Sequence, residues 1–277
     1  MSFEDYELSV EGGKPYELFE FIYQGITERY TSADHIVVVN LVPYTPIAGL
    51  NRVSEIEDTG KNVASQNMTI EAFPGFPPAE LFAVCPPSSV VNVLIKRVQE
   101  GDLTDPKVIW AGRVLSVGWT EDKVKMTCQS LFTRLKQPGL RRLYGKTCPH
   151  LLYSQGPGQC NVVAEDFRVP VTISAVSGIT VTSSDFDAFP DEYFRGGKLT
   201  IETSPGIFEQ RGIQQHVGDT VTMTHALSNF VPGLTVDAFP GCDKTIETCH
   251  NKFANVVNFG GTPYIPQKNP FGNNTVF

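Results

Sequence analysis

The chain has 277 residues, enough for about two domains of ordinary size. Apolar residues make up 41% and charged residues 19%, a composition that supports a packed core and excludes a disordered chain. Acidic residues number 30 and basic residues 22, so the formal charge is −8, which argues against a protein that coats duplex nucleic acid with a basic surface.

The hydropathy pattern indicates neither a membrane span nor an export signal. The longest apolar runs, such as Ile36–Val39, are far shorter than the roughly 18 residues that a spanning helix needs. The acidic start, Met1–Asp5, lacks the apolar centre of a secretory signal. The 24 glycines and 20 prolines indicate many turns in place of long helices.

The first half of the chain predicts strands, because short runs of β-branched and aromatic residues alternate with Gly, Pro, Ser or Asn. The expected strands are 16–23, 26–31, 35–42, 66–73, 90–98, 108–119 and 124–128. The last two form a hairpin, with Val124, Met126 and Cys128 on one face. Residues 77–82 predict one helical turn, and 130–135 a short helix that Pro138 ends.

The second half opens with a loop-rich stretch, 143–161, and then returns to strands. The expected strands are 169–176, 179–183, 198–203, 207–213 and 220–227. One helix is expected from about 244 to 257, with Asp243 as its N-cap, because Ile246, Cys249 and Phe253 keep helical spacing. The final stretch, 260–277, has three prolines and no acidic residue, and we expect it to run extended over a surface.

The six cysteines are not equivalent. Cys148 and Cys160 flank a short Gly/Pro loop, and Cys242 and Cys249 flank a turn about eighty residues later. Two close pairs separated in this way are typical of a four-ligand site that holds zinc or an iron–sulfur cluster. Neither pair has the short CxxC spacing of zinc knuckles, which favours a cluster. Five cations, Arg134, Lys136, Arg141, Arg142 and Lys146, would help to stabilise four thiolates.

Other interpretations of the same residues stay open. Two disulfides would explain the close pairs in an oxidising compartment, and buried inert thiols are common. For Cys85 and Cys128, apolar surroundings predict thiols in the core. The basic run is equally typical of a solvated face.

Signs of an enzyme are weak. Cys148 and His150 could suggest a thiol nucleophile, but they are sequence neighbours and no third group is indicated. The other histidines are scattered singly, and Gly156-Pro157-Gly158 lacks the Lys-Ser/Thr of a phosphate loop. We therefore expect no enzymatic activity.

Several blocks, spread in order over nearly the whole chain, resemble the tail-hub proteins of long-tailed phages and gene transfer agents. They are 29–34, 110–114, 138–144 with 148–153, 193–199, and the end from Gly241-Cys242-Asp243-Lys244 through Thr248-Cys249, Lys252-Phe253, Asn255, Asn258-Phe259-Gly260-Gly261 and Pro263 to Ile265-Pro266. The chain is also similar to the tail-tip protein of lambda-like phages, whose C-terminal domain holds an iron–sulfur cluster on four cysteines.

The resemblance implies a structural virion protein, assembled in the host cytoplasm and placed at the tail tip. Such hubs form a homotrimer between the distal tail protein and tail tube on one side and the central fibre or receptor-binding proteins on the other. They line part of the genome-ejection channel and lie near the tape measure protein. DNA would be met only in transit, and an acidic ring would repel it.

Carried over to this chain, the resemblance implies a 4Fe-4S cluster on Cys148, Cys160, Cys242 and Cys249. The chain departs from the family where Ser154–Gln159 lengthens the loop before Cys160. The expected fold is mainly β: two β-barrel or sandwich-like domains, 1–135 and 136–277, with a short C-terminal helix and a four-cysteine metal site. The alternatives are a metal-stapled adaptor outside a virion, and a tail-borne cell-wall hydrolase that uses Cys148.

Overall fold

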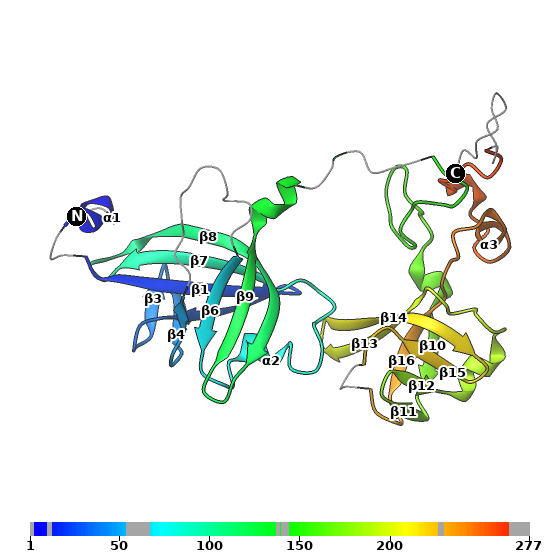
Figure 1. Cartoon of the computed structure of the whole chain (residues 1–277), viewed down its shortest axis with the longest axis horizontal. Helices are drawn as coiled ribbons and strands as arrows, with labels where there is room; N and C mark the ends of the chain where they lie inside the picture. The colour runs from blue at the N-terminus through cyan, green and yellow to red at the C-terminus, as the bar shows by residue number, and fades with distance from the viewer. Residues whose placement is uncertain are drawn as a thin grey trace. The chain divides into compact units, whose positions relative to one another are not determined.

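The computed structural model describes residues 3–9, 13–53, 67–136, 139, 144–226 and 230–265. The chain divides into two compact units, Met1–Pro138 and Gly139–Phe277, called the first and second units below. Both are built mainly from strands, so the mainly β fold class is confirmed (Figure 1). Within the described ranges, no helix is long and apolar enough to cross a membrane.

The first unit is one curled sheet of nine strands. They are β1 (Pro15–Tyr23), β2 (Ile26–Thr31), β3 (Val37–Val39), β4 (Val42–Pro46), β5 (Asn51–Arg52), β6 (Asn67–Ala72), β7 (Asn92–Gln99), β8 (Asp102–Trp119) and β9 (Val124–Ser130). Their order is β3-β4-β2-β1-β7-β8-β9-β6-β5, with β2 and β4 parallel. The sheet curls on itself, because Arg52 Nη2 on the last strand lies 2.9 Å from Glu17 Oε1 on β1. The helices are α1 (Phe3–Glu7), α2 (Pro77–Glu80) and the 3-10 helix Leu131–Lys136.

Strand β1 is buried on both faces and forms the centre of the first unit. Phe19 and Phe21 point to one side, where Phe21 packs edge-on against Phe76 with 5.4 Å between ring centroids. Leu18 and Glu20 point to the other side, which the β3–β4 hairpin covers. Leu18 joins a buried cluster there with Ala33, Val37, Val39, Tyr44 and Val98.

A buried carboxylate fastens this hairpin to the sheet. Glu20 is 7% exposed and accepts hydrogen bonds from the Tyr44 hydroxyl at 2.5 Å and from Lys96 Nζ at 2.8 Å, while Arg29 Nε lies 3.8 Å away. Burial alone would raise the pKa of Glu20. The hydrogen bonds from Lys96 and Tyr44 and the charges of Lys96 and Arg29 outweigh that effect and lower it.

The hairpin also corrects the sequence-based prediction of one strand over 35–42. The chain instead turns at Asn40 and Leu41, whose φ angles are 49° and 66°. Two consecutive left-handed residues form the tight turn that joins antiparallel strands. The sequence did not indicate this turn, because leucine is unusual in a left-handed turn position and the β-branched run around Leu41 is typical of a strand. Leu41 is 95% exposed.

The second unit is a seven-stranded antiparallel sheet that closes into a barrel. Its strands are β10 (Val169–Thr172), β11 (Ala175–Ser177), β12 (Thr180–Thr182), β13 (Lys198–Ser204), β14 (Ile207–Val217), β15 (Thr220–Met223) and β16 (Thr235–Phe239). Their order is β10-β16-β13-β14-β15-β12-β11. The two outer strands follow each other in the chain: the Ile173 N–H donates to Leu234 O beside β16, and the Ser174 N–H to Thr182 O on β12, both at 2.9 Å. This crossing point closes the barrel.

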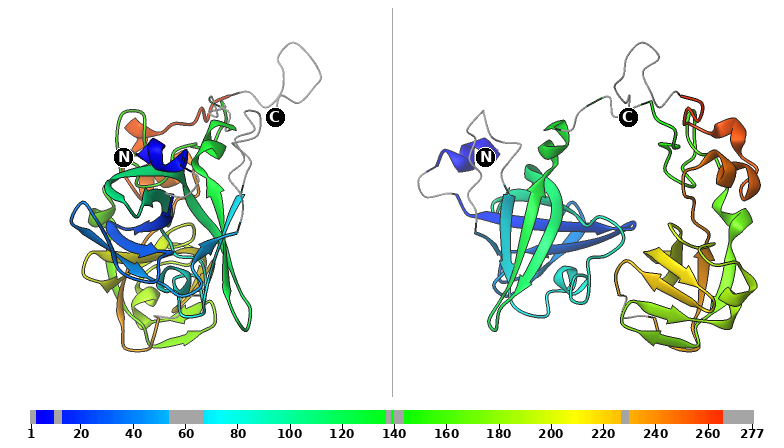
Figure 2. Two further views of the ribbon diagram at one scale, coloured as in Figure 1. Left: turned by 90° about the vertical axis from the view of Figure 1, so that its left-hand side faces the viewer. Right: turned by 45° about the vertical axis from the view of Figure 1, so that its right-hand side comes forward.

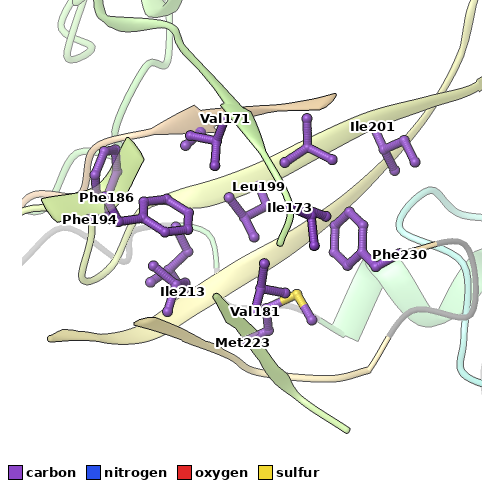
Figure 3. Close-up of a cluster of buried hydrophobic side chains, with 13 residues drawn as sticks. Val171, Ile173, Val181, Phe186, Phe194, Leu199, Ile201, Ile213, Met223 and Phe230 are labelled. Carbon is purple, nitrogen blue, oxygen red and sulfur yellow. The ribbon is translucent and has the colours of Figure 1, made fainter. Parts of the chain in front are cut away.

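The interior of the barrel is filled by apolar side chains from all around it (Figure 3). The buried set is Val171, Ile173, Val181, Phe186, Phe194, Leu199, Ile201, Ile213, Val221, Met223, Phe230, Val236 and Ala238. Phe186 and Phe194 meet edge to face with 5.4 Å between their centroids. Strand β16, which supplies Val236 and Ala238, is absent from the sequence-based prediction.

The helices of the second unit are short. They are α3 (Ile246–Asn251) and the 3-10 helices Ala164–Phe167, Ser184–Ala188 and Val256–Asn258. The single helix expected over 244–257 is therefore wrong: its N-cap is Thr245, not Asp243, and the chain leaves the helix before Ala254, which has a φ of 47°. Asp243 instead accepts a hydrogen bond from the Thr245 N–H at 2.9 Å.

Replacing Glu20 by Gln should destabilise the first unit by about 3 kcal/mol at pH 7, because Lys96 and Arg29 would then face a neutral side chain. Since the folded-state pKa of Glu20 is lowered, this contribution is complete above about pH 4.3 and is lost as the pH falls through the folded value. Urea unfolding followed by tryptophan fluorescence measures it, because Trp110 and Trp119 both belong to the first unit.

The matched control is Glu71→Gln. Glu71 pairs with Lys123 at 2.7 Å, but the Lys123 side chain is 51% exposed, so the expected cost is below about 1 kcal/mol. Equal losses for the two variants, or a Glu20 effect that persists unchanged at pH 3, would contradict this account.

Candidate four-cysteine site

The four clustered cysteines come from two segments that lie side by side at one end of the barrel (Figures 1 and 2). Cys148 and Cys160 belong to the loop 144–161, Cys242 follows β16, and Cys249 lies on α3. Backbone hydrogen bonds join the segments: the Cys148 N–H donates to Lys244 O at 2.9 Å, and the Thr262 N–H to Gly145 O at 2.8 Å. Lys244 Nζ also donates to His150 O at 2.6 Å.

The four thiols share one electrostatic neighbourhood. Burial raises the pKa of Cys249 to about 11, and Cys242, Cys148 and Cys160 each raise it further by their proximity. Burial also raises the pKa of Cys242, against the opposing effect of the hydrogen bond and charge of Lys244. The structure thus brings together the residues that the cysteine spacing singles out.

Three of the sulfurs face N–H donors. The Lys244 N–H lies 3.4 Å from Cys242 Sγ, the Gly260 N–H lies 3.4 Å from Cys148 Sγ, and Asn255 Nδ2 lies 3.9 Å from Cys160 Sγ. The Gly260 backbone lies close to the His150 ring: an added Cβ would lie 2.2 Å from His150 Nε2, so a larger residue would require that ring to move. Donors aimed at sulfur stabilise thiolates and metal-bound sulfur.

A lysine fastens the cysteine segment to the barrel. Lys252 Nζ donates to Tyr193 O and, at 2.8 Å, to Gly241 O, and lies 4.0 Å from the centroid of the Tyr193 ring. Burial lowers the pKa of Lys252 to about 8, while Cys242 and Asp243 act in the opposite direction. In the sequence Lys252 stands out only within the block Lys252-Phe253, with no role assigned to it, because a lysine at the end of a helix carries no signal of its contacts.

Of the basic run proposed to neutralise the thiolates, the structure describes the side chains of two residues. Arg134 and Lys146 are exposed, and the side chains of Lys136, Arg141 and Arg142 lie outside the described part of the chain. The cations that act on Cys242 are Lys244 and Lys252.

A cavity of about 800 Å³ lies beside α3 and reaches Cys242. Its lining includes four carboxylates, those of Asp191, Glu192, Asp243 and Glu247. Of its two cations, Arg195 pairs with Glu192 at 2.8 Å and Lys252 is already bonded to backbone oxygens. The approach to Cys242 is therefore acidic.

The other two cysteines differ from each other. Cys128 is fully buried on β9, and burial raises its pKa to about 12, as expected for a thiol in the core. Cys85 is only partly buried and lies in the loop after α2, so the prediction of a core thiol is wrong there.

No disulfide joins any of the six cysteines. Among the described residues, no group of three or more His, Cys, Asp or Glu side chains has the arrangement needed to hold a metal ion. The expected metal site is therefore not shown. Four neighbouring thiols with N–H groups aimed at three sulfurs fit a thiolate-bound metal or cluster.

Comparison with known proteins gives three findings. Residues 192–269 match the model of a family described as phage conserved hypothetical protein BR0599, and this segment includes Cys242 and Cys249. An uncharacterized protein of Xylella fastidiosa (strain 9a5c) is 28% identical over 183 residues, 61% of this chain, and the chain spans 37% of that relative's length. The fold is similar to that of a chain in the solved virion of a native gene transfer agent (GTA) particle, with a TM-score of 0.75, 20% identity, and coverage of 96% of this chain and 92% of that one.

Replacing Lys252 by Met should loosen the cysteine segment, because two backbone oxygens lose a charged donor. Hydrogen bonds to charged groups contribute about 1.5–3 kcal/mol each, so the loss of two such bonds should make amides of residues 241–262 exchange at least about a hundredfold faster. Hydrogen-exchange mass spectrometry measures this directly.

Lys198→Met is the matched control. Lys198 also lies over an aromatic ring, 5.0 Å from the Phe239 centroid, but its one hydrogen bond, to Gln210 Oε1, is exposed. It should change exchange in 241–262 less than about threefold. The interpretation of Lys252 as a fastener would be wrong if both variants behaved alike.

Proposed function

We propose that this protein is a structural virion protein, a homotrimeric hub at the distal tip of a phage-type tail, and not an enzyme. The fold similarity over nearly the whole chain to a chain of the GTA virion carries the proposal. The phage family model supports it independently, since it matches the segment that holds half of the cysteine site. In this role the hub would link the tail tube and distal tail protein to the central fibre or receptor-binding proteins.

Surface features support contacts with other virion proteins. Strand β3 is one edge of the first unit's sheet, and Ile36, Val38 and Leu41 along this hairpin are 60%, 49% and 95% exposed. An edge strand with exposed apolar side chains favours pairing with another chain. The formal charge of −8 suits a ring through which DNA passes without binding.

Within this function, Cys148, Cys160, Cys242 and Cys249 would hold an iron–sulfur cluster of the 4Fe-4S type as a structural staple. The segments that carry them have few buried side chains, among them Val162, Cys249 and Phe253, so packing contributes little to their stability. A metal centre supplies folding free energy, on the order of 10 kcal/mol for zinc.

Anaerobic purification tests the cluster. The wild-type protein should contain iron and sulfide and absorb near ~400 nm. Cys242→Ser and Cys249→Ser should lose both, whereas Cys85→Ser, the same change outside the site, should retain them. If the wild-type protein contained zinc and no sulfide, the site would be a zinc site and not a cluster. If the wild-type protein contained no metal, the proposal of a structural metal site would be wrong.

Particle analysis tests the hub. We expect the protein in purified particles, a ring-shaped trimer of 30.5 kDa chains in solution, and particles without tail tips when its gene is deleted. A stable monomer that is absent from particles would favour an adaptor outside a virion. Peptidoglycan cleavage lost in Cys148→Ser would instead support the cell-wall hydrolase.

A further inference from the structure

A chain of asparagine side chains runs through the cysteine site. Asn258 Nδ2 donates to Asn255 Oδ1 at 2.6 Å, and Asn161 Nδ2 lies 3.4 Å from Asn258 Oδ1. At the far end, the Gly156 N–H donates to Asn161 Oδ1 at 2.8 Å. The network connects the loop before Cys160 to the segment that follows α3.

Asn255 joins two cysteines that are far apart in sequence. Its Nδ2 donates to Cys160 O at 2.5 Å and lies 3.9 Å from Cys160 Sγ, and its backbone N–H donates to Cys249 O at 2.9 Å. One residue therefore fixes the Cys160 backbone against the end of α3 and directs an amide donor at the Cys160 sulfur.

The network also fixes which way the Asn255 amide points. Cys160 O can only accept, so the atom beside it must be Nδ2. Asn258 then supplies a donor to Asn255 Oδ1, which satisfies the other end of the same amide. Flipping Asn255 would place its oxygen against Cys160 O and its NH₂ against a donor, so the observed orientation is the stable one.

We propose that Asn255 is the positioning residue of the cysteine site. It holds Cys160 in register with Cys249 before any metal binds and supplies the N–H donor to the Cys160 sulfur. This inference rests on the proposed metal-binding role and assigns a task to residues of the phage-family segment, since Asn255 and Asn258 both lie within 192–269.

The test compares Asn255→Asp with Asn251→Asp in the full-length protein. The first change keeps the shape and the Oδ1 acceptor but removes the donor to Cys160. The second places the same charge on an exposed residue of α3. After reconstitution with ferrous iron and sulfide, we expect Asn255→Asp to lose iron to a chelator ten- to a hundredfold faster than wild type. Asn251→Asp should match wild type.

A rescue variant separates positioning from folding. Asn255→His can present its Nδ1–H where the asparagine Nδ2–H lies, so it should retain iron better than Asn255→Asp by at least about tenfold. Hydrogen exchange in β13 and β14 should stay unchanged in all three variants, which a general folding role for Asn255 would not allow. Equal retention by Asn255→Asp and Asn251→Asp, or no rescue by His, would overturn the proposal.

Experiments on wild type and on the metal-free protein separate a failure of the proposed metal site from a failure of the role proposed for Asn255. If wild type binds iron and Asn255→Asp behaves like it, positioning fails and the metal site stands. If wild type binds neither iron nor zinc, the metal site fails. Exchange of amides 154–162 then decides whether Asn255 still positions the loop: at least tenfold faster exchange in Asn255→Asp supports this, and unchanged exchange overturns it.

Discussion

Polar pairing between two distant stretches of backbone shapes the cysteine site, because those stretches have little core of their own. The Cys148 N–H bonds to Lys244 O, Lys244 Nζ to His150 O, and Asn255 to Cys160 O. A bond between neutral groups contributes only about 1 kcal/mol net, and the one from the Lys244 ammonium about 1.5–3 kcal/mol, so the arrangement depends on several bonds acting together and on a rigid support. A ligand that bound all four sulfurs would tie the same two stretches more strongly than any of these bonds alone.

The closed barrel provides that support. The stretch 169–177 joins the two ends of the sheet, since β10 pairs with β16 and β11 pairs with β12, and buried apolar side chains fill the interior. Lys252 connects the cysteine segment to the barrel, since its ammonium bonds to Gly241 O, immediately before Cys242, and to Tyr193 O beside the barrel core. The first unit differs in keeping a free edge strand, β3, with exposed apolar side chains. In the proposed hub the first unit would contact other virion proteins, and the second unit would hold the structural metal site.

Side-chain alternation predicted most strands, because inward and outward positions differ chemically: Val221 and Met223 are buried as expected, and Val124, Met126 and Cys128 share a buried face. The prediction failed where backbone turns decide the structure. Asn40 and Leu41 split an apolar run into a hairpin, and Ala254 ends the expected helix. The grouping of the cysteines was visible in their spacing. The roles of Lys252 and Asn255 were not visible in the sequence, because both side chains bond to backbone oxygens that only the folded chain brings near them.

The loop before Cys160, which we expect to be longer than in phage tail hubs, is held at its base by its own hydrogen bonds. The loop is closed across its own base: the Asn161 N–H donates to Ser154 O at 2.7 Å and the Cys160 N–H to Ser154 Oγ at 3.3 Å. The left-handed φ of 58° at Asn161, a conformation that asparagine tolerates, completes this closure. Extra residues can then project from the base without displacing Cys160, whose carbonyl is held from the other side by Asn255. In the proposed site, the position of Cys160 would thus depend little on the length of the loop before it.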